Sequence, residues 1–216
     1  PTLRVAQPMD GRTYAGVLTI AAQASDTGGI RKVVASIADS TGKVVKEVPL
    51  WTEGTPGTYA GFLDTLKLVD GSYTVTVTVW DRAMNNASGT VAIKVDNTAP
   101  VLSKFNAGDK EKVKIQAVFT EATSIRTAML RIDGGSWKEM TSKDGLTYTY
   151  EWSTKEGDNG AHNVELRATD SVGNEARYTK QVQIKDAHKI ASQIEKETKE
   201  RFSNAIVTVH IEPECA

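Results

Sequence analysis

Two acidic residues are each followed, four positions later, by an asparagine, and this spacing suggests cation binding. Asp81 precedes Asn85, and Asp170 precedes Asn174. Carboxylate, amide and backbone carbonyl oxygens are the ligands that Ca²⁺ takes in proteins, so each pair is a candidate calcium site. The alternative is that each Asp caps a turn by accepting hydrogen bonds from nearby backbone amides. One carboxylate per site supplies little charge for a dedicated calcium cage, which favours the capping role.

Exposed tryptophans are the second set of side chains that could bind a ligand. Trp51 and Trp137 lie near turns and are expected to be exposed, whereas Trp80 and Trp152 lie in alternating segments and are expected to pack in a core or between domains. An exposed indole ring can stack on a sugar ring. Trp51 and Trp137 are therefore candidates for glycan binding.

The sequence offers no set of residues for catalysis, and we expect a non-enzymatic chain. No serine has histidine and carboxylate partners in a recognisable motif, and no glycine-rich phosphate loop opens a helix. Cys215 is the single cysteine and lies near the chain end, a poor place for a preorganised nucleophile. An alternative is that the chain is an accessory region of an exported hydrolase, such as a protease.

Composition limits the possible partners and the compartment. The chain of 216 residues carries 26 basic and 27 acidic residues, for a formal charge of -1, so no global field attracts nucleic acid. No apolar run approaches the roughly 20 residues that span a bilayer, so we expect no transmembrane segment. A single cysteine excludes an internal disulfide. The sequence has no signal peptide and begins at Pro1, from which we expect a processed product or a piece of a longer protein.

The elements that must position these residues occur twice in the chain. Residues 70–86 and 158–174 each contain a glycine turn, a run that alternates at period two, and an Asp-x-x-x-Asn turn into another alternating run. In register, Tyr73 aligns with His162. Alternation at period two separated by turn residues is typical of paired strands in a β-sandwich. A repeat offset of about ninety residues predicts two domains.

Further strands are predicted on either side of a domain boundary. The predicted strands cover residues 16–22, 30–37, 43–49, 59–63, 72–80 and 89–95, then 113–119, 125–132, 147–152 and 181–184. The segment 96–100 ends in Pro100 and interrupts the pattern. We therefore predict an all-β chain with two tandem sandwiches, residues 1–96 and 97–185, followed by a tail, 186–216.

The repeated element resembles the Ig-like modules of bacterial and archaeal cell-surface and secreted proteins. Those modules carry a D-G-x-Y-x-V-x-V-x-A-x-D-x-x-G-N stretch, which residues 70–85 match closely. The departures are Met84 in place of glycine and His162 in place of tyrosine. The resemblance implies that Tyr73 forms a tyrosine corner, with its hydroxyl bonded to the backbone, and that His162 can do so only through a ring nitrogen.

The tail changes to a helical period and then back to alternation. Asp186 is a suitable N-cap, and apolar residues recur along 187–202 on one stripe, which predicts a helix. Residues 205–212 alternate and predict a strand. A lone helix and strand cannot cover their own apolar faces, so we expect the tail to pack on the second sandwich or to mediate self-association.

The tail also resembles the end of the cytoplasmic C-terminal domain of cation diffusion facilitator transporters. Its "A-H-x-I-A" helix start and "V-x-V-H-x-E-P" strand end are the shared motifs. The resemblance implies a ferredoxin-like unit that dimerises and binds Zn²⁺ or another divalent metal through His188, His210 and Glu212. Alternatively, the two histidines are ordinary solvated side chains.

These observations together predict a structural or interaction module of a larger surface or secreted prokaryotic protein. The tail would serve as its association element, with a protein partner or a second copy. A metal-binding or glycan-binding module is the alternative. The Ig-like resemblance predicts an extracellular or cell-surface location, whereas the tail resemblance favours the cytoplasm.

Overall fold

The computed structural model describes residues 1–109, 112–154, 158–185 and 196–201. The described chain is almost entirely β-structure, and residues 196–201 are helical. It forms two compact units: residues 1–99 with 171–174, and residues 100–170 with those from 175 onward. The main division, between Ala99 and Pro100, lies three residues after the predicted boundary. The prediction of an all-β chain with sandwich domains is confirmed.

The first unit contains eight strands and one 3-10 turn. These are β1 (Thr2–Gln7), β2 (Thr13–Tyr14), β3 (Val17–Ser25), β4 (Ile30–Asp39), β5 (Val44–Thr52), β6 (Thr58–Asp64), η1 (Thr65–Lys67), β7 (Gly71–Asp81) and β8 (Asn86–Val95).

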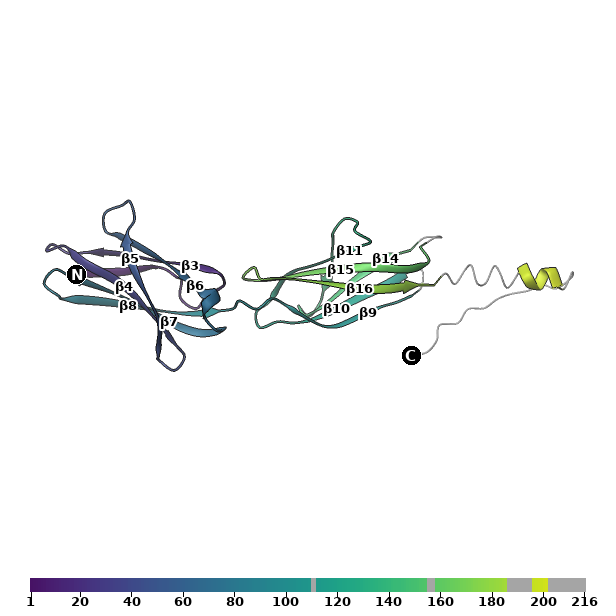
Figure 1. Ribbon diagram of the computed structural model, residues 1–216, viewed down its shortest axis with the longest axis horizontal. Coiled ribbons are helices and arrows are strands. Elements are labelled where there is room, and N and C mark those ends of the chain that lie inside the picture. The colour runs from purple at the N-terminus through teal and green to yellow at the C-terminus, as the bar shows by residue number, and fades with distance from the viewer. Residues whose placement is uncertain (110–111, 155–157, 186–195, 202–216) are drawn as a thin grey trace. The chain divides into compact units, whose positions relative to one another are not determined.

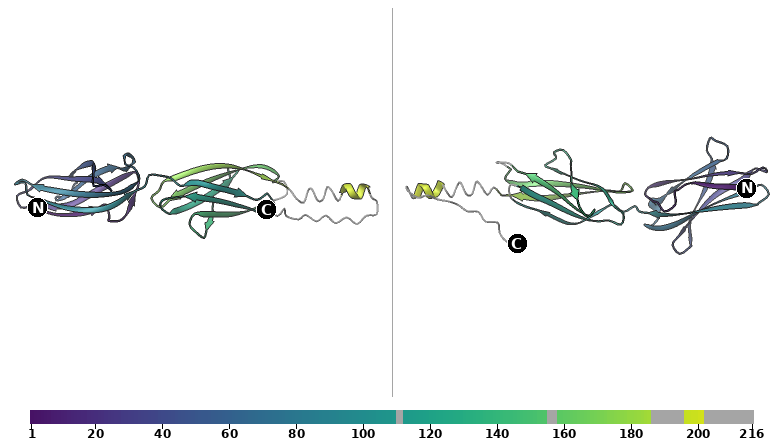
Figure 2. Two further views of the ribbon diagram at one scale, coloured as in Figure 1. Left: turned by 90° about the horizontal axis from the view of Figure 1, so that it is seen from below. Right: turned by 180° about the vertical axis from the view of Figure 1, so that it is seen from behind.

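These strands form two layers that β5 joins. The hydrogen-bonded order is β1-β3-β6-β5-β4-β7-β8-β2, in which β5 pairs first with β4 and then, through Trp51 and Thr52, with β6. Figures 1 and 2 show the first unit as these two layers. The short β2 runs parallel to β8, whereas the other pairs are antiparallel. This arrangement, with one N-terminal segment on each sheet, is that of immunoglobulin-like sandwiches.

Alternation along the strands builds the core of the first unit. In β7, residues 73, 75, 77 and 79 are buried and their neighbours are partly exposed, so one face of the strand points inward. The inward side chains of both layers form one buried cluster, in which Ile20, Ile37, Val75, Val77 and Val79 are fully buried.

The described part of the second unit contains the other eight strands. These are β9 (Val101–Ala107), β10 (Lys112–Thr120), β11 (Ile125–Ile132), β12 (Lys138–Glu139), β13 (Thr141–Ser142), β14 (Thr147–Ser153), β15 (Gly160–Asp170) and β16 (Glu175–Ile184).

Two four-stranded sheets make up this second sandwich. Their orders are β13-β14-β10-β9 and β12-β11-β15-β16. Their inner faces enclose a separate core that includes Ile115, Phe119, Leu130 and Leu166. Phe119 contacts Tyr148 edge-on, with ring centroids 6.0 Å apart. Each unit therefore has a hydrophobic core of its own.

The turn in the repeated element strains the backbone at Met84, where the aligned residue is glycine. Met84 has φ = 72° and the aligned Gly173 has φ = 109°, so both copies need a left-handed backbone at this position. Glycine adopts this conformation without strain, whereas methionine does not. Met84 is 52% exposed, and its sulfur accepts a hydrogen bond from Arg31 Nη1 at 3.0 Å.

Candidate binding surface

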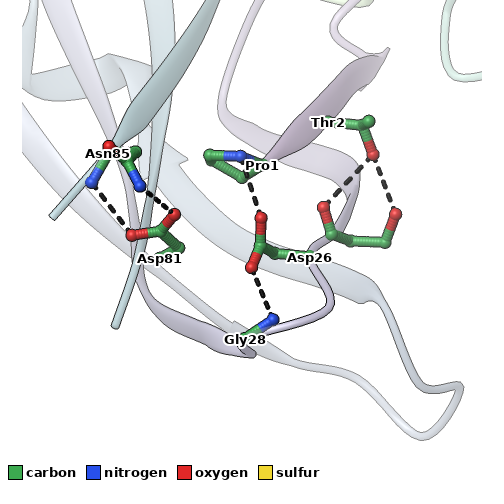
Figure 3. Close-up of polar contacts among 7 residues, drawn as sticks. Pro1, Thr2, Asp26, Gly28, Asp81 and Asn85 are labelled. Atoms are coloured by element: carbon green, nitrogen blue, oxygen red, sulfur yellow. Dashed lines mark hydrogen bonds and ion pairs between the residues drawn. The ribbon is translucent and has the colours of Figure 1, made fainter. Parts of the chain in front are cut away.

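The Asp81 turn uses both of its carboxylate oxygens internally. Asp81 Oδ1 accepts a hydrogen bond from the Asn85 backbone amide at 2.9 Å, and Oδ2 accepts one from the Asn85 side-chain amide at 2.9 Å. Figure 3 shows both oxygens turned toward Asn85. The side-chain hydrogen bond from Asn85 is the main cause that lowers the pKa of Asp81, against the opposing effect of burial. These contacts are those of a turn cap.

The neighbouring loop has a similar aspartate. Asp26 Oδ1 accepts from the Gly28 amide at 2.7 Å, and its Oδ2 lies 3.1 Å from the Pro1 ammonium nitrogen (Figure 3).

The second predicted pair is Asp170 and Asn174. Asp170 is fully buried and has polar partners. Asn174, which groups with the first unit, donates from its side-chain amide to the Asp96 carbonyl oxygen at 2.9 Å.

The two aligned corner residues make equivalent hydrogen bonds. Tyr73 donates its hydroxyl to the Val69 carbonyl at 2.7 Å, four residues earlier. His162 places Nε2 2.9 Å from the Asp158 carbonyl oxygen, also four residues earlier. His162 Nδ1 in addition lies 2.6 Å from Asp133 Oδ2. The expected tyrosine corner is present, and a ring nitrogen takes the place of the hydroxyl in the second copy.

Trp137 is covered by two cations. The guanidinium carbons of Arg131 and Arg167 lie 4.9 Å and 4.8 Å from the Trp137 ring centroid. Arg131 also donates two hydrogen bonds to Glu165, at 2.9 Å and 2.7 Å. These hydrogen bonds lower the pKa of Glu165. Trp137 is half-buried in this arrangement, so its ring is less available for stacking than the sequence predicts.

Trp80 and Trp152 are also in contact with polar side chains. Trp80 lies on the outer face of β7, with Lys32 Nζ 4.1 Å from its ring centroid, so the expectation of a core position is wrong for Trp80. Trp152 packs partly against the second core and meets the His162 ring edge-on at 5.0 Å.

Trp51 differs because its side chain is 71% exposed. Phe62, on the adjacent strand β6, is 66% exposed. Trp51 pairs with Ala60, which precedes Phe62 by two residues, so the two aromatic side chains are diagonal neighbours on one sheet face. They border an open hollow of about 420 Å³ whose lining includes Pro49, Ala60 and Gly61. We call this feature the Trp51–Phe62 hollow.

Gly61 gives the hollow its floor. A Cβ atom at this position would lie 2.7 Å from Leu50 Cδ2 and 2.8 Å from the Pro49 carbonyl oxygen. The backbone of β5 therefore approaches β6 closely where it crosses between the layers. The sequence pattern does not mark Gly61 or Phe62 as residues of a binding surface. Alternation in 59–63 places Phe62 opposite the buried Leu63, but only the β5 crossing brings it near Trp51.

The predicted metal ligands His188, His210 and Glu212 lie outside the described residues. Within the described residues, no helix is long and apolar enough to cross a membrane.

The fold defines immunoglobulin-like sandwich modules, and family comparison agrees for part of the chain. A family model described as bacterial Ig domain matches residues 1–77. A second, described as the cytoplasmic domain of cation efflux proteins, matches residues 175–214, of which 175–184 form β16. Each match covers less than half of the chain. No curated protein matches significantly.

Solved structures with detectable similarity include several tandem modules. The fibronectin(III)-like modules of Clostridium thermocellum CbhA share 16% identity, with 87% of this chain and 96% of that chain covered and a TM-score of 0.43. A tetra-tandem repeat of a large adhesion protein shares 21%, covering 80% and 46%, with a TM-score of 0.36. Titin domains A168–A170 share 9%, covering 84% and 65%, with a TM-score of 0.49.

Proposed function

We propose that this chain is a non-catalytic structural and interaction module of a larger surface or secreted prokaryotic protein. The observation that carries the proposal is that each unit has a separate, closed sandwich core. The bacterial Ig domain match over residues 1–77 supports it, because such modules are typically non-catalytic.

Hydrogen bonds hold the segment that follows β8 to the rest of the first unit. This supports a role in linking neighbouring parts of a chain. Beyond β8, the Asn97 side-chain carbonyl accepts hydrogen bonds from the Gly16 amide at 3.2 Å and from the Thr65 hydroxyl at 3.1 Å. The Asn97 side-chain amide donates to the Thr65 carbonyl at 2.8 Å. Asp70 accepts from the Asn97 backbone amide at 2.7 Å and from the Thr98 hydroxyl. The chain therefore leaves this unit at a fixed position.

Surface location is tested on cells of the source organism. An antibody against the first unit should label intact cells, or recover the parent protein from the medium, without permeabilisation. Labelling that requires lysis would contradict the proposal. In a second experiment, residues 1–185 are replaced in the parent protein by an unrelated pair of sandwich domains. Retained export with altered attachment would indicate that these sandwiches also make specific contacts.

A metal-linked association element in the tail is a second candidate, favoured by the cation efflux match over residues 175–214. On this proposal His188, His210 and Glu212 bind Zn²⁺ between two copies. Light scattering with and without Zn²⁺ tests it, on the whole chain and on a chain ending at Lys185. A dimer that Zn²⁺ tightens only in the whole chain supports it. Masses that are equal and indifferent to Zn²⁺ exclude it.

A further inference from the structure

The Trp51–Phe62 hollow exposes two aromatic side chains that the fold does not need to expose. Trp51 and Phe62 are 71% and 66% exposed, while Ala60 between them is 9% exposed. Exposure of large apolar side chains to water is energetically unfavourable. Two exposed aromatic rings side by side therefore indicate a contact surface. The floor is made of small residues, Ala60 and Gly61, so the rings stand above it.

The rings of the other three tryptophans each contact a cationic or aromatic side chain of this protein. Trp80 lies against Lys32, Trp137 against Arg131 and Arg167, and Trp152 against His162. Within the described part of the chain, no cation or ring contacts Trp51 in a comparable way. Its indole face is therefore available to a ligand from outside.

The chemistry of the lining narrows the class of ligand. An aromatic face attracts the polarised C–H groups of a sugar ring, and an indole N–H can donate a hydrogen bond to a sugar hydroxyl. Thr52 and Glu53 supply a hydroxyl and a carboxylate beside the rings. Among the described lining residues Glu53 carries the only formal charge, and it is negative. A polyanion would be repelled at this carboxylate, whereas the hydroxyls of a neutral sugar would donate to it.

The shape of the hollow favours a chain rather than a single small molecule. Its volume is about 420 Å³, and it lies open on a sheet face rather than enclosed. Enclosed pockets bury most of a drug-sized ligand, and this hollow does not have that form. Two aromatic side chains on neighbouring strands can contact successive residues of an extended polymer.

We propose that the Trp51–Phe62 hollow binds a neutral polysaccharide chain, by stacking sugar rings on Trp51 and Phe62 and accepting a hydroxyl hydrogen bond at Glu53. The inference goes beyond the proposed function, because it concerns the purified chain and holds wherever the parent protein lies.

The test is a titration of the full chain, labelled with ¹⁵N, with neutral hexasaccharides. Cellohexaose, mannohexaose and chitohexaose are the probes, and hexagalacturonate is the anionic comparison. The indole N–H signals are assigned by tryptophan-to-phenylalanine variants. We expect the Trp51 signal to shift saturably with at least one neutral probe and not with hexagalacturonate.

Matched variants separate this surface from the rest of the protein. Trp51→Ala and Phe62→Ala should each weaken binding by roughly tenfold or more, as for an aromatic at the centre of an interface. Glu53→Gln should weaken binding less, because an amide oxygen still accepts a hydrogen bond. Trp137→Ala is the control and should bind as the unmodified chain does. Thermal melts establish that each variant is folded.

Three results would overturn the proposal. The first is the absence of a saturable Trp51 shift with all three neutral probes. The second is equal binding of hexagalacturonate. The third is a Trp51 signal that depends on protein concentration without sugar, together with a lower mass of the Trp51→Ala variant in light scattering. That last result would assign the surface to contact between two copies of this chain. None of these results bears on surface location, so the proposed function stands or falls separately.

Discussion

Raising the pH above neutrality should destabilise the second unit, because the native contacts of His162 require a charged ring. Nε2 faces the Asp158 carbonyl oxygen at 2.9 Å, and Nδ1 faces the Asp133 carboxylate at 2.6 Å. Both partners are acceptors, so both ring nitrogens must carry protons for both hydrogen bonds to form. A neutral ring with its proton on Nε2 would turn an unprotonated Nδ1 toward a carboxylate. The imidazolium is therefore the form that fits.

The sign of the pH dependence follows from the two pKa shifts. The hydrogen bond with Asp133 raises the pKa of His162, with a further contribution from the Asp158 carbonyl and an opposing one from burial. This stabilisation is complete below the unfolded pKa of about 6.5 and is lost as the pH rises through the higher folded value. The same contact lowers the pKa of Asp133 from 3.8. That second contribution is present above 3.8 and is lost as the pH falls through the lowered folded value.

The size of the effect depends on exposure. His162 is 15% exposed at its side chain, but Asp133 is 49% exposed, so solvent screens their interaction. A hydrogen bond to a charged group contributes about 1.5–3 kcal/mol when well shielded. After screening we expect about 1 kcal/mol, which corresponds to a fall of about 4–8 °C in the melting temperature of a domain of this size.

Scanning calorimetry of the full chain between pH 5.5 and 9 measures the effect. His162→Tyr is the matched control, because tyrosine reproduces the Tyr73 arrangement and does not titrate below a pH of about 10. The variant identifies which transition belongs to the second unit, and that transition should lose its dependence on pH between 6 and 9. Identical pH profiles for the two proteins would refute the reasoning. So would a His162 pKa at or below the ordinary value of about 6.5, measured by NMR.

Three further substitutions test the backbone and the corner of the first unit by chemical denaturation. Met84→Gly should stabilise by about 0.5–1 kcal/mol, because relief of left-handed strain exceeds the added entropy of the unfolded chain; a loss of stability would show that the Met84 side chain contributes more than its strain costs. Gly61→Ala should destabilise by about 1–3 kcal/mol, since its Cβ would lie 2.8 Å from the Pro49 carbonyl oxygen; an unchanged midpoint would mean that β5 can move away freely. Tyr73→Phe should cost about 1 kcal/mol through loss of the hydrogen bond to Val69. A variant as stable as the unmodified chain would contradict that assignment.

The fold was predictable because its signals are local. Alternation at period two gave the long strands of both units, and the aligned turns gave the repeat. The corner hydrogen bonds of Tyr73 and His162 also follow from position, since each ring reaches a carbonyl four residues earlier. Met84 shows the limit of such signals. The sequence shows that methionine stands where the repeat has glycine. Only the backbone geometry shows that Met84 keeps the left-handed turn.

The candidate surface was predictable only in part, because it depends on contacts between distant strands. Proximity to a turn suggested that both Trp51 and Trp137 were exposed. Trp137 instead meets Arg131 and Arg167, which the register of β11 with β15 brings to one face. Trp51 lies near Phe62 because β5 pairs with β6 at this point. Alternation along a strand does not specify which strand it will pair with.

The parallel pairing of β2 with β8 has a mechanical consequence. Lys94 donates its amide to the Arg12 carbonyl at 2.9 Å, and Asp96 donates to the Tyr14 carbonyl at 3.0 Å. When the two ends of the first unit are pulled apart, parallel strands slide along one another, so these bonds bear the load together rather than opening one by one. In the described part of the second unit, β16 is the last strand of its sheet and lacks such a partner. Under tension in optical tweezers, the second unit should therefore unfold at the lower force and the first unit should act as the stronger link.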